Sequence, residues 1–272
     1  MDPTKLAVGA GTAVLIAGGG YGISTLFNGG MPDYVSFSTT TSTLYVFDSP
    51  DYFVDIDHKD SSSWWTWVYN TRYWVGSDNK TAEEETRPTP KRGFENLKDA
   101  EGIKATCKAV YTAAKEKVKS TGEPSTDEYF EADVWRYCTA VKKKPIVVDS
   151  AFKPGSTSEK EDSEYSNGTF GKANKDKLVS ITAKDNDSFW QEQQRLFFKK
   201  QGNRSGASLK NNSVFKDLYN KLAKGEEIKA NALKSTCQEA YNQTEATTSS
   251  QSPNKYPKED VFKFCSLKGS SN

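Results

Sequence analysis

The chain has 272 residues, which is enough for two modest domains. Its net charge is only +1, from 37 basic and 36 acidic residues, and just six of the basic residues are arginines, so no nucleic-acid partner is expected. Hydrophobic residues make up 35% of the chain and aromatic residues 12%, which predicts small cores built largely from Trp, Tyr and Phe.

An uncharged segment runs from Leu6 to Phe27. As a helix, its 22 residues rise about 33 Å, which matches the hydrocarbon thickness of a bilayer. We therefore expect residues 1–28 to form an N-terminal transmembrane anchor in contact with membrane lipid, with the bulk of the chain outside the cell. The alternative is a cleaved signal peptide with a basic start at Lys5. The glycines also resemble a dinucleotide-binding loop, but Val14 stands where that loop requires a third glycine.

Residues 29–59 are expected to form a stalk. A tract rich in serine and threonine occupies residues 36–43, and residues 44–57 place two aromatic, β-favouring runs around the sequence Asp-Ser-Pro-Asp. This pattern predicts a short β-hairpin near 44–57. A lone hairpin is marginally stable in water, so it would have to pack on the domain that follows.

The first helical module is predicted over residues 60–149. Asp60 and three serines precede an aromatic run that begins at Trp64, a pattern typical of a capped helix start. After an exposed loop at 76–93, apolar residues recur at spacings of three, four and seven and place Cys107 on an inward face. The same spacing in residues 134–141 points Cys138 inward.

Residues 150–177 are rich in Ser, Lys, Gly, Glu and Asn and show no apolar period, so they predict a flexible linker. A second module over 178–268 follows, with its own capped aromatic start at 185–190 and a polar loop at 242–255. Residues 269–272 are left as a tail.

The two modules carry copies of one pattern. The sequence KATC at 104–107 and the later DVWRYC at 133–138 correspond to KSTC at 234–237 and DVFKFC at 260–265. Because the four cysteines fall at equivalent places, two in each copy, we expect one disulfide inside each module, Cys107 with Cys138 and Cys237 with Cys265, formed in an oxidising compartment. Closing a loop of about thirty residues should stabilise each module by roughly 3 to 4 kcal/mol.

The predicted fold is therefore mainly α. It consists of an N-terminal transmembrane helix followed by two tandem small helical modules, each with one intramodule disulfide, and a short hairpin near 44–57.

Groups that could carry catalysis or bind a metal are scarce. His58 is the only histidine, which removes most routes to Ser-His-Asp catalysis and to histidine-bound zinc. The cysteines lack the short spacing of a zinc site, and the acidic clusters at 83–85 and 161–164 lack the alternating ligands of a calcium loop. We predict no catalytic, cofactor-binding or metal-binding residue and no enzymatic activity, although a carboxylate pair for sugar hydrolysis would leave no trace in residue spacing.

Four tryptophans cluster at the start of the first module, namely Trp64, Trp65, Trp67 and Trp74. If exposed, they could form a platform on which a ligand stacks. Their helical spacing favours packing in the core instead.

The start MDPTKLAVGAGTAVLIAGGG, the composition rich in lysine and asparagine, and the segment KATCKAVY with the later DVWRYC resemble the large uncharacterised paralogous protein families of haemotropic mycoplasmas. The resemblance covers the anchor and the cysteine segments and hardly touches the linker. It implies a membrane protein displayed on a wall-less bacterium that lives on red blood cells, with a part in antigenic variation or host contact. It carries no catalytic residue over to this chain.

We accordingly expect a surface-displayed, single-pass membrane protein that contacts a host or neighbouring protein. One alternative is a membrane-tethered extracytoplasmic hydrolase that uses carboxylates. Another is a variable antigenic decoy with no fixed ligand.

Overall fold

The structure is a computed structural model that describes residues 30–74, 88–150, 165–209, 213–244 and 255–271, together with the backbone of Val14 and Leu15. It is mainly helical, as the sequence predicts, with two short two-stranded sheets. In the first, β1 (Val14–Leu15) pairs antiparallel with β4 (Ile228–Lys229); in the second, β2 (Val118–Lys119) pairs in parallel with β3 (Tyr129–Phe130).

The first half of the chain is built from short helices. In chain order they are the 3₁₀ helices η1 (Tyr45–Asp48), η2 (Pro50–Tyr52) and η3 (Lys59–Ser61), helix α2 (Ser62–Val68), the π-helical turn η4 (Tyr69–Tyr73), helix α3 (Ala100–Tyr111), the 3₁₀ helix η5 (Lys115–Lys117) and helix α4 (Glu131–Cys138). Helix α3 begins where the Asp99 side chain accepts a hydrogen bond from the amide of Gly102, which caps an otherwise unpaired donor. The helix ends at Tyr111, four residues after Cys107.

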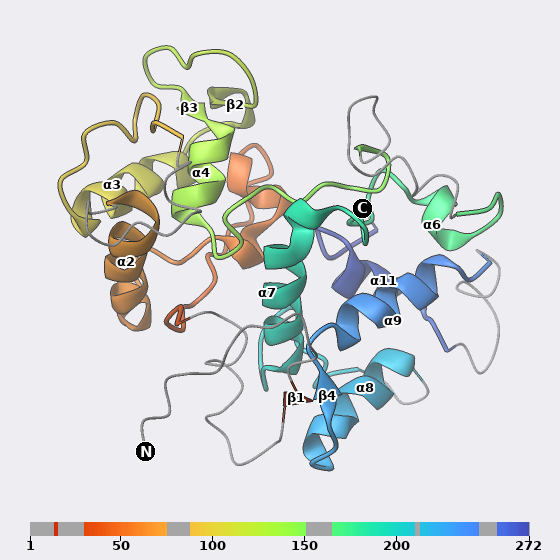
Figure 1. The fold of residues 1–272 in the computed structure, drawn as a ribbon. Helices are drawn as coiled ribbons and strands as arrows, with labels where there is room; N and C mark the ends of the chain where they lie inside the picture. The colour runs from red at the N-terminus through yellow and green to blue at the C-terminus, as the bar shows by residue number, and fades with distance from the viewer. Residues whose placement is uncertain are drawn as a thin grey trace.

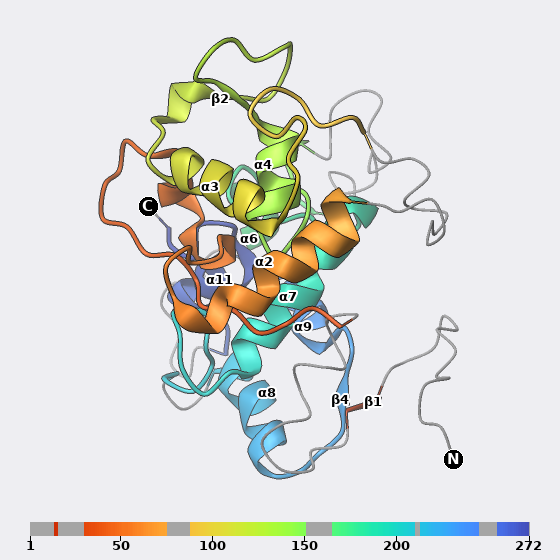
Figure 2. The same ribbon diagram turned by 90° about the vertical axis from the view of Figure 1, so that its left-hand side faces the viewer.

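The second half follows the same plan. Its elements are α6 (Phe170–Ala173), the 3₁₀ helix η7 (Lys184–Asn186), α7 (Asp187–Phe198), α8 (Val214–Ala223), α9 (Ala232–Tyr241) and α11 (Lys258–Cys265). Figure 1 shows α2, α3 and α4 on one side of α7 and α6, α9 and α11 on the other. Figures 1 and 2 both place β2 at one end of the molecule and α8 at the other.

Both predicted disulfides are confirmed. Cys107 of α3 is bonded to Cys138 of α4, with their α-carbons 5.6 Å apart, and Cys237 of α9 is bonded to Cys265 of α11, with their α-carbons 5.7 Å apart. All four cysteines are fully buried. Each bridge therefore joins two neighbouring helices through the interior of its half.

A tyrosine next to each disulfide repeats the same contacts. The Tyr111 hydroxyl donates to the carbonyl oxygens of Val54 and Cys138, at 2.8 and 3.0 Å. The Tyr241 hydroxyl donates to those of Val179 and Cys265, at 2.9 and 2.8 Å. The duplicated pattern in the sequence thus corresponds to a duplicated set of interactions. In each half these interactions include an extended segment that precedes an aromatic-rich helix, α2 in the first half and α7 in the second.

Removing either hydroxyl should therefore have the same effect. We expect Tyr111→Phe and Tyr241→Phe each to lower the free energy of unfolding by about 1 to 1.5 kcal/mol, because each change deletes a buried hydrogen bond. Denaturant titration of the two variants would measure this. Tyr256→Phe, which removes a hydroxyl from an exposed bond to Glu239, is the control and should change stability by less than about 0.5 kcal/mol. Unequal losses at the two buried tyrosines would contradict the equivalence.

The repeated unit is longer than the sequence predicts. In the first half the amide of Phe37 donates to the carbonyl of Phe53, and in the second half the amide of Val148 donates to that of Leu178. The amide of Val35 then binds the Ser61 hydroxyl, as the amide of Ile146 binds the Asn186 side chain. Each repeated unit therefore includes two extended segments that are hydrogen-bonded to each other and that precede α2 or α7.

The predicted stalk and hairpin are consequently wrong. Residues 44–57 form η1, η2 and an extended segment, and Val46, Tyr52 and Phe53 are fully buried. These aromatic and β-branched side chains belong to the core of the first half. Residues 44–57 therefore have a composition that is typical of strands, although they do not form a hairpin. The predicted linker at 150–177 is likewise too long, because Tyr165 and Phe170 are buried and α6 lies within it; residues 151–164 lie outside the described residues.

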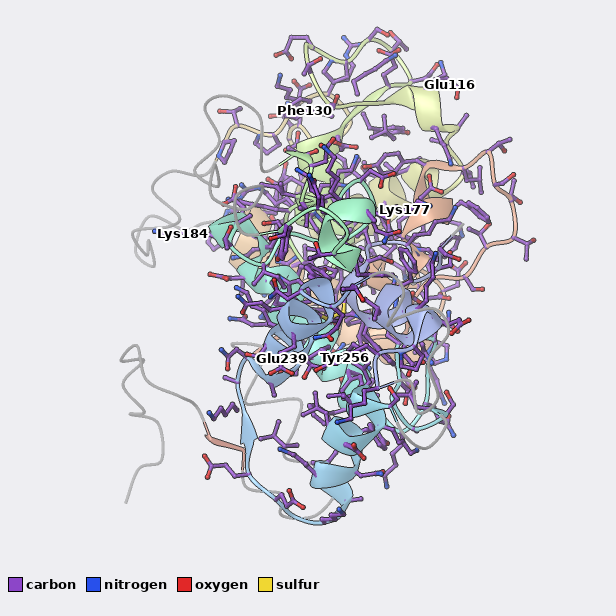
Figure 3. All side chains as sticks on the ribbon, turned by 90° about the vertical axis from the view of Figure 1, so that its right-hand side faces the viewer. Glu116, Phe130, Lys177, Lys184, Glu239 and Tyr256 are labelled. Carbon is purple, nitrogen blue, oxygen red and sulfur yellow. A yellow bond between two sulfur atoms is a disulfide. The ribbon has the colours of Figure 1, made fainter. Side chains whose placement is uncertain are left out.

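One continuous cluster of buried side chains extends through both halves. Figure 3 shows the side chains on the ribbon, with Glu116 and Phe130 toward one end of the molecule and Glu239 and Tyr256 nearer its middle. The two halves therefore pack directly on each other through a shared core.

The predicted anchor lies almost wholly outside the described residues. Within it, only Val14 and Leu15 are described, and they form β1. In the part of the chain that the structure describes, no helix has both the length and the apolar character needed to cross a membrane.

Candidate functional site

Helix α7 is buried on almost all sides because both halves pack against it (Figures 1 and 2). Aromatic and aliphatic side chains at its two ends account for much of this burial, but the four consecutive residues 192–195 are Glu, Gln, Gln and Arg. Buried polar groups are costly unless they are hydrogen-bonded. Their partners therefore show what this helix does.

Glu192 and Arg195 form the charged centre of the junction between the halves. Arg195 binds both carboxylate oxygens of Glu192, at 2.8 and 2.7 Å, and its remaining nitrogen pairs with Asp33 at 2.7 Å. The Tyr34 hydroxyl donates to Glu192 in a very short bond. Burial would lower the pKa of Arg195, but the adjacent carboxylates raise it above its ordinary value. Two residues of the first half are thus held by two residues of the second.

Two buried glutamines of α7, Gln193 and Gln194, connect the helix to other elements at the same junction. The Tyr52 hydroxyl of the first half donates to the Gln193 side-chain oxygen at 2.6 Å, and the Gln193 nitrogen donates to the Phe264 carbonyl at 3.0 Å. The Gln194 side-chain oxygen accepts from the amide of Leu233 at 2.9 Å. Each amide side chain therefore links α7 to a different element.

A second ion pair crosses the junction at Arg204, whose side chain is 2% exposed. Its Nε binds an Asp51 carboxylate oxygen at 2.7 Å, and the other Asp51 oxygen accepts from Asn203 at 3.0 Å. The two terminal nitrogens of Arg204 donate to the carbonyls of Lys263, Ser266 and Leu267, at 2.7, 2.9 and 2.6 Å. All three side-chain nitrogens of this arginine have acceptors. Burial lowers the pKa of Arg204, but Tyr52 and Asp51 together raise it above its ordinary value.

Arg72 occupies the corresponding place in the first half. Its terminal nitrogens donate to the carbonyls of Arg136, Thr139 and Ala140, at 3.0, 2.6 and 2.9 Å. Its guanidinium carbon lies 4.8 Å from the centre of the Trp67 ring, a cation–π distance. Burial, with a smaller contribution from Arg136, lowers the pKa of Arg72 to about 9.

The residues singled out in the sequence are distributed unevenly. Trp64 and Trp65 are buried, as packing predicts, whereas Trp67 is half-buried and Trp74 is 57% exposed. His58 is exposed, and its Nδ1 accepts a hydrogen bond from the amide of Asp60, so it caps η3.

No metal centre forms in the described part of the chain, where no group of three or more His, Cys, Asp or Glu residues is placed to hold an ion. The acidic clusters at 83–85 and 161–164 lie outside the described residues. Of the buried carboxylates in the described part of the chain, Glu192 and Asp51 are bound by arginines, and Asp133 accepts a hydrogen bond from the amide of Lys91 at 2.7 Å. The half-buried Asp260, whose pKa is raised by burial, accepts from the Ser213 hydroxyl at 2.6 Å.

Comparison with known proteins found no match for this chain. That result holds for protein-family models, curated proteins and solved structures alike. The buried polar residues of the candidate site pair with one another and join the two halves of the chain.

Sequence reasoning missed the residues that build this junction, chiefly Arg204, Asp51 and Glu192, and it also missed Arg72, which corresponds to Arg204 in the first half. One signal was present, since arginine is rare in a chain whose basic residues are mostly lysine, and Arg binds several carbonyls or a carboxylate better than Lys. Arg72 and Arg204 do not stand at the same offset as the paired cysteines, so the duplicated pattern alone could not align them.

The buried tyrosines predict loss of stability at high pH. Burial raises the pKa of Tyr34, Tyr45, Tyr52 and Tyr111, so the folded protein keeps their protons above pH 10 while the unfolded chain releases them. Their stabilising effect is complete below about pH 10 and declines as pH rises further. The lowered pKa values of Arg72, Lys199 and Lys263 act in the opposite direction and reduce this effect.

Ultraviolet absorbance of phenolate, followed together with helical circular dichroism, would check this. These four tyrosines should ionise only as the helical signal is lost. Ionisation of every tyrosine with the helical signal intact would contradict the burial argument.

Proposed function

We propose that this protein is a surface-displayed binding protein, held at the cell membrane by residues 6–27 and contacting a host or neighbouring protein through its extracellular part. The observation that supports the proposal best is the pair of disulfides at equivalent, fully buried positions. Buried bridges of this kind form and persist in oxidising environments and are rare in the cytosol.

The use of the buried charges also favours a binding role. Arg195, Arg204, Glu192 and Asp51 neutralise one another inside the protein and join its halves. Catalytic acids and bases usually lie in a cleft with a free face toward substrate. Because these four charged groups are paired with one another inside the protein, they favour a scaffold that binds a partner through its outer surface.

Labelling of intact cells that produce the protein, with an amine-reactive reagent that cannot cross membranes, tests the location. The exposed lysines, such as Lys108 and Lys224, should be modified before lysis, while a cytoplasmic protein in the same cells should not. Modification only after lysis would place the protein inside the cell and end the proposal.

The anchor can be tested separately. After alkaline carbonate extraction, the full chain should stay with the membrane pellet, and a variant lacking residues 6–27 should be soluble. If the full chain is extracted too, then residues 6–27 do not span the bilayer. The pairing of Val14 and Leu15 with β4 would then describe the segment better.

A further inference from the structure

Arg72 and Arg204 are equivalent residues with one difference. Each donates to three carbonyl oxygens at the end of the second cysteine helix of its half, and these carbonyls stand at matching positions, Arg136, Thr139 and Ala140 in one and Lys263, Ser266 and Leu267 in the other. The terminal nitrogens are thus used in the same way in both halves. Only the Nε positions differ.

In the second half, the Nε of Arg204 donates to the Asp51 carboxylate. The Nε of Arg72 has no hydrogen-bond partner among the described residues, although its side chain is only 5% exposed. A buried charged donor without an acceptor is costly. The internal comparison also shows which group satisfies such an arginine in this protein, namely a carboxylate.

The groups around Arg72 are aromatic rings and hydrogen-bond donors, and none of them supplies an acceptor to its Nε among the described residues. Its guanidinium lies against the rings of Trp64 and Trp67, and the indole nitrogen of Trp64 is itself buried with no acceptor in the described structure. Of the charged groups that act on Arg72, Arg136 is positive, and the Glu192 carboxylate is already bound by Arg195 and Tyr34.

We propose that Arg72, with Trp64 and Trp67, forms a binding site for a small carboxylate whose oxygen accepts the hydrogen bond of Arg72 Nε. The group would be of the size of acetate, because the arginine lies under other side chains. Binding would provide Arg72 with the acceptor that Asp51 provides for Arg204.

Met31 lies beside this site. Its sulfur lies 3.9 Å from a terminal nitrogen of Arg72, and it is 8% exposed, next to the exposed Gly30. Methionine is flexible and apolar, so it can move aside but cannot compensate the charge. A glutamate at position 31 has a similar length, so its carboxylate should accept the hydrogen bond of Arg72 in place of a bound ligand.

The experiment measures the melting temperature of the full chain in sodium acetate and in sodium chloride at matched ionic strength. Acetate is expected to raise the melting temperature saturably, by about 2 to 4 °C more than chloride. Met31→Glu should abolish this difference, because its own carboxylate reaches Arg72. Met31→Gln has the same shape without the charge and should keep the difference. Met31→Glu should also melt at a higher temperature than Met31→Gln.

Two outcomes would overturn the proposal. Equal effects of acetate and chloride on the wild-type protein would mean that Arg72 is satisfied by its three carbonyls alone. An acetate effect that persists unchanged in Met31→Glu would place the acetate elsewhere. Both Met31 variants keep Arg72 and its carbonyl contacts, so the comparison does not depend on a variant that loses the fold.

Discussion

Replacing Asp51 with asparagine is expected to lower the free energy of unfolding by about 3 to 5 kcal/mol. The substitution keeps the shape of the side chain but leaves the charge of Arg204, which is 2% exposed, without its carboxylate. Removing one member of a buried ion pair is costly because the other charge stays in a medium that solvates it poorly. Denaturant-induced unfolding, followed by tryptophan fluorescence and circular dichroism, would measure the loss.

The matched control is Asp48→Asn, which removes a carboxylate from the neighbouring 3₁₀ helix η1. Asp48 pairs with Lys115 at 2.6 Å and Lys268 at 3.7 Å on the surface, and its side chain is 48% exposed, so we expect a loss below about 1 kcal/mol. The double variant Asp51→Asn with Arg204→Met should lose less than the sum of the two single variants, because the uncompensated charge is gone. Equal losses for Asp48→Asn and Asp51→Asn would show that the ion pair at the junction contributes little.

Removal of either disulfide should cost about 2 to 5 kcal/mol. The bridges close loops of similar length, with sequence separations of 31 and 28 residues, so the Cys107→Ala/Cys138→Ala and Cys237→Ala/Cys265→Ala variants should lose similar amounts. Alanine leaves both buried positions apolar, which limits the effect mainly to the crosslink. Urea titration of the two double variants would give the values.

The shared core also predicts how many unfolding transitions the urea titrations of the cysteine variants will show. Because buried side chains of both halves form one cluster, loss of either bridge should shift a single unfolding transition rather than create two. Two separate transitions, with one half still folded, would show that the halves are independent and that the junction described here is weak.

Local features of the sequence were enough to predict the helices and the bridges. The spacing around Cys107 and Cys138 defines one apolar face, and both side chains are fully buried as that face requires. A capped start followed by aromatic residues likewise located α2, although Ser61 binds the amide of Val35 instead of capping the helix. These features depend on residues close together in the chain.

The features that the sequence did not reveal depend on distant residues. Tyr34 and Glu192 are separated by 158 positions, and Asp51 and Arg204 by 153, so no local periodicity connects them. The hairpin prediction failed for the same reason. Phe53 is buried because its neighbours are an extended segment at 35–37 and helix α4, not because a second strand follows it directly.

The bonds between residues 146–148 and 178–180 determine how this chain can be divided into fragments. A fragment that starts at 178 would lack the partner of its first extended segment, so an expression fragment for the second unit should begin just after Val141. Conversely, a protease cut within residues 151–164 would leave both partners of that pair in place. The nicked halves should then co-elute in size-exclusion chromatography without any covalent link between them.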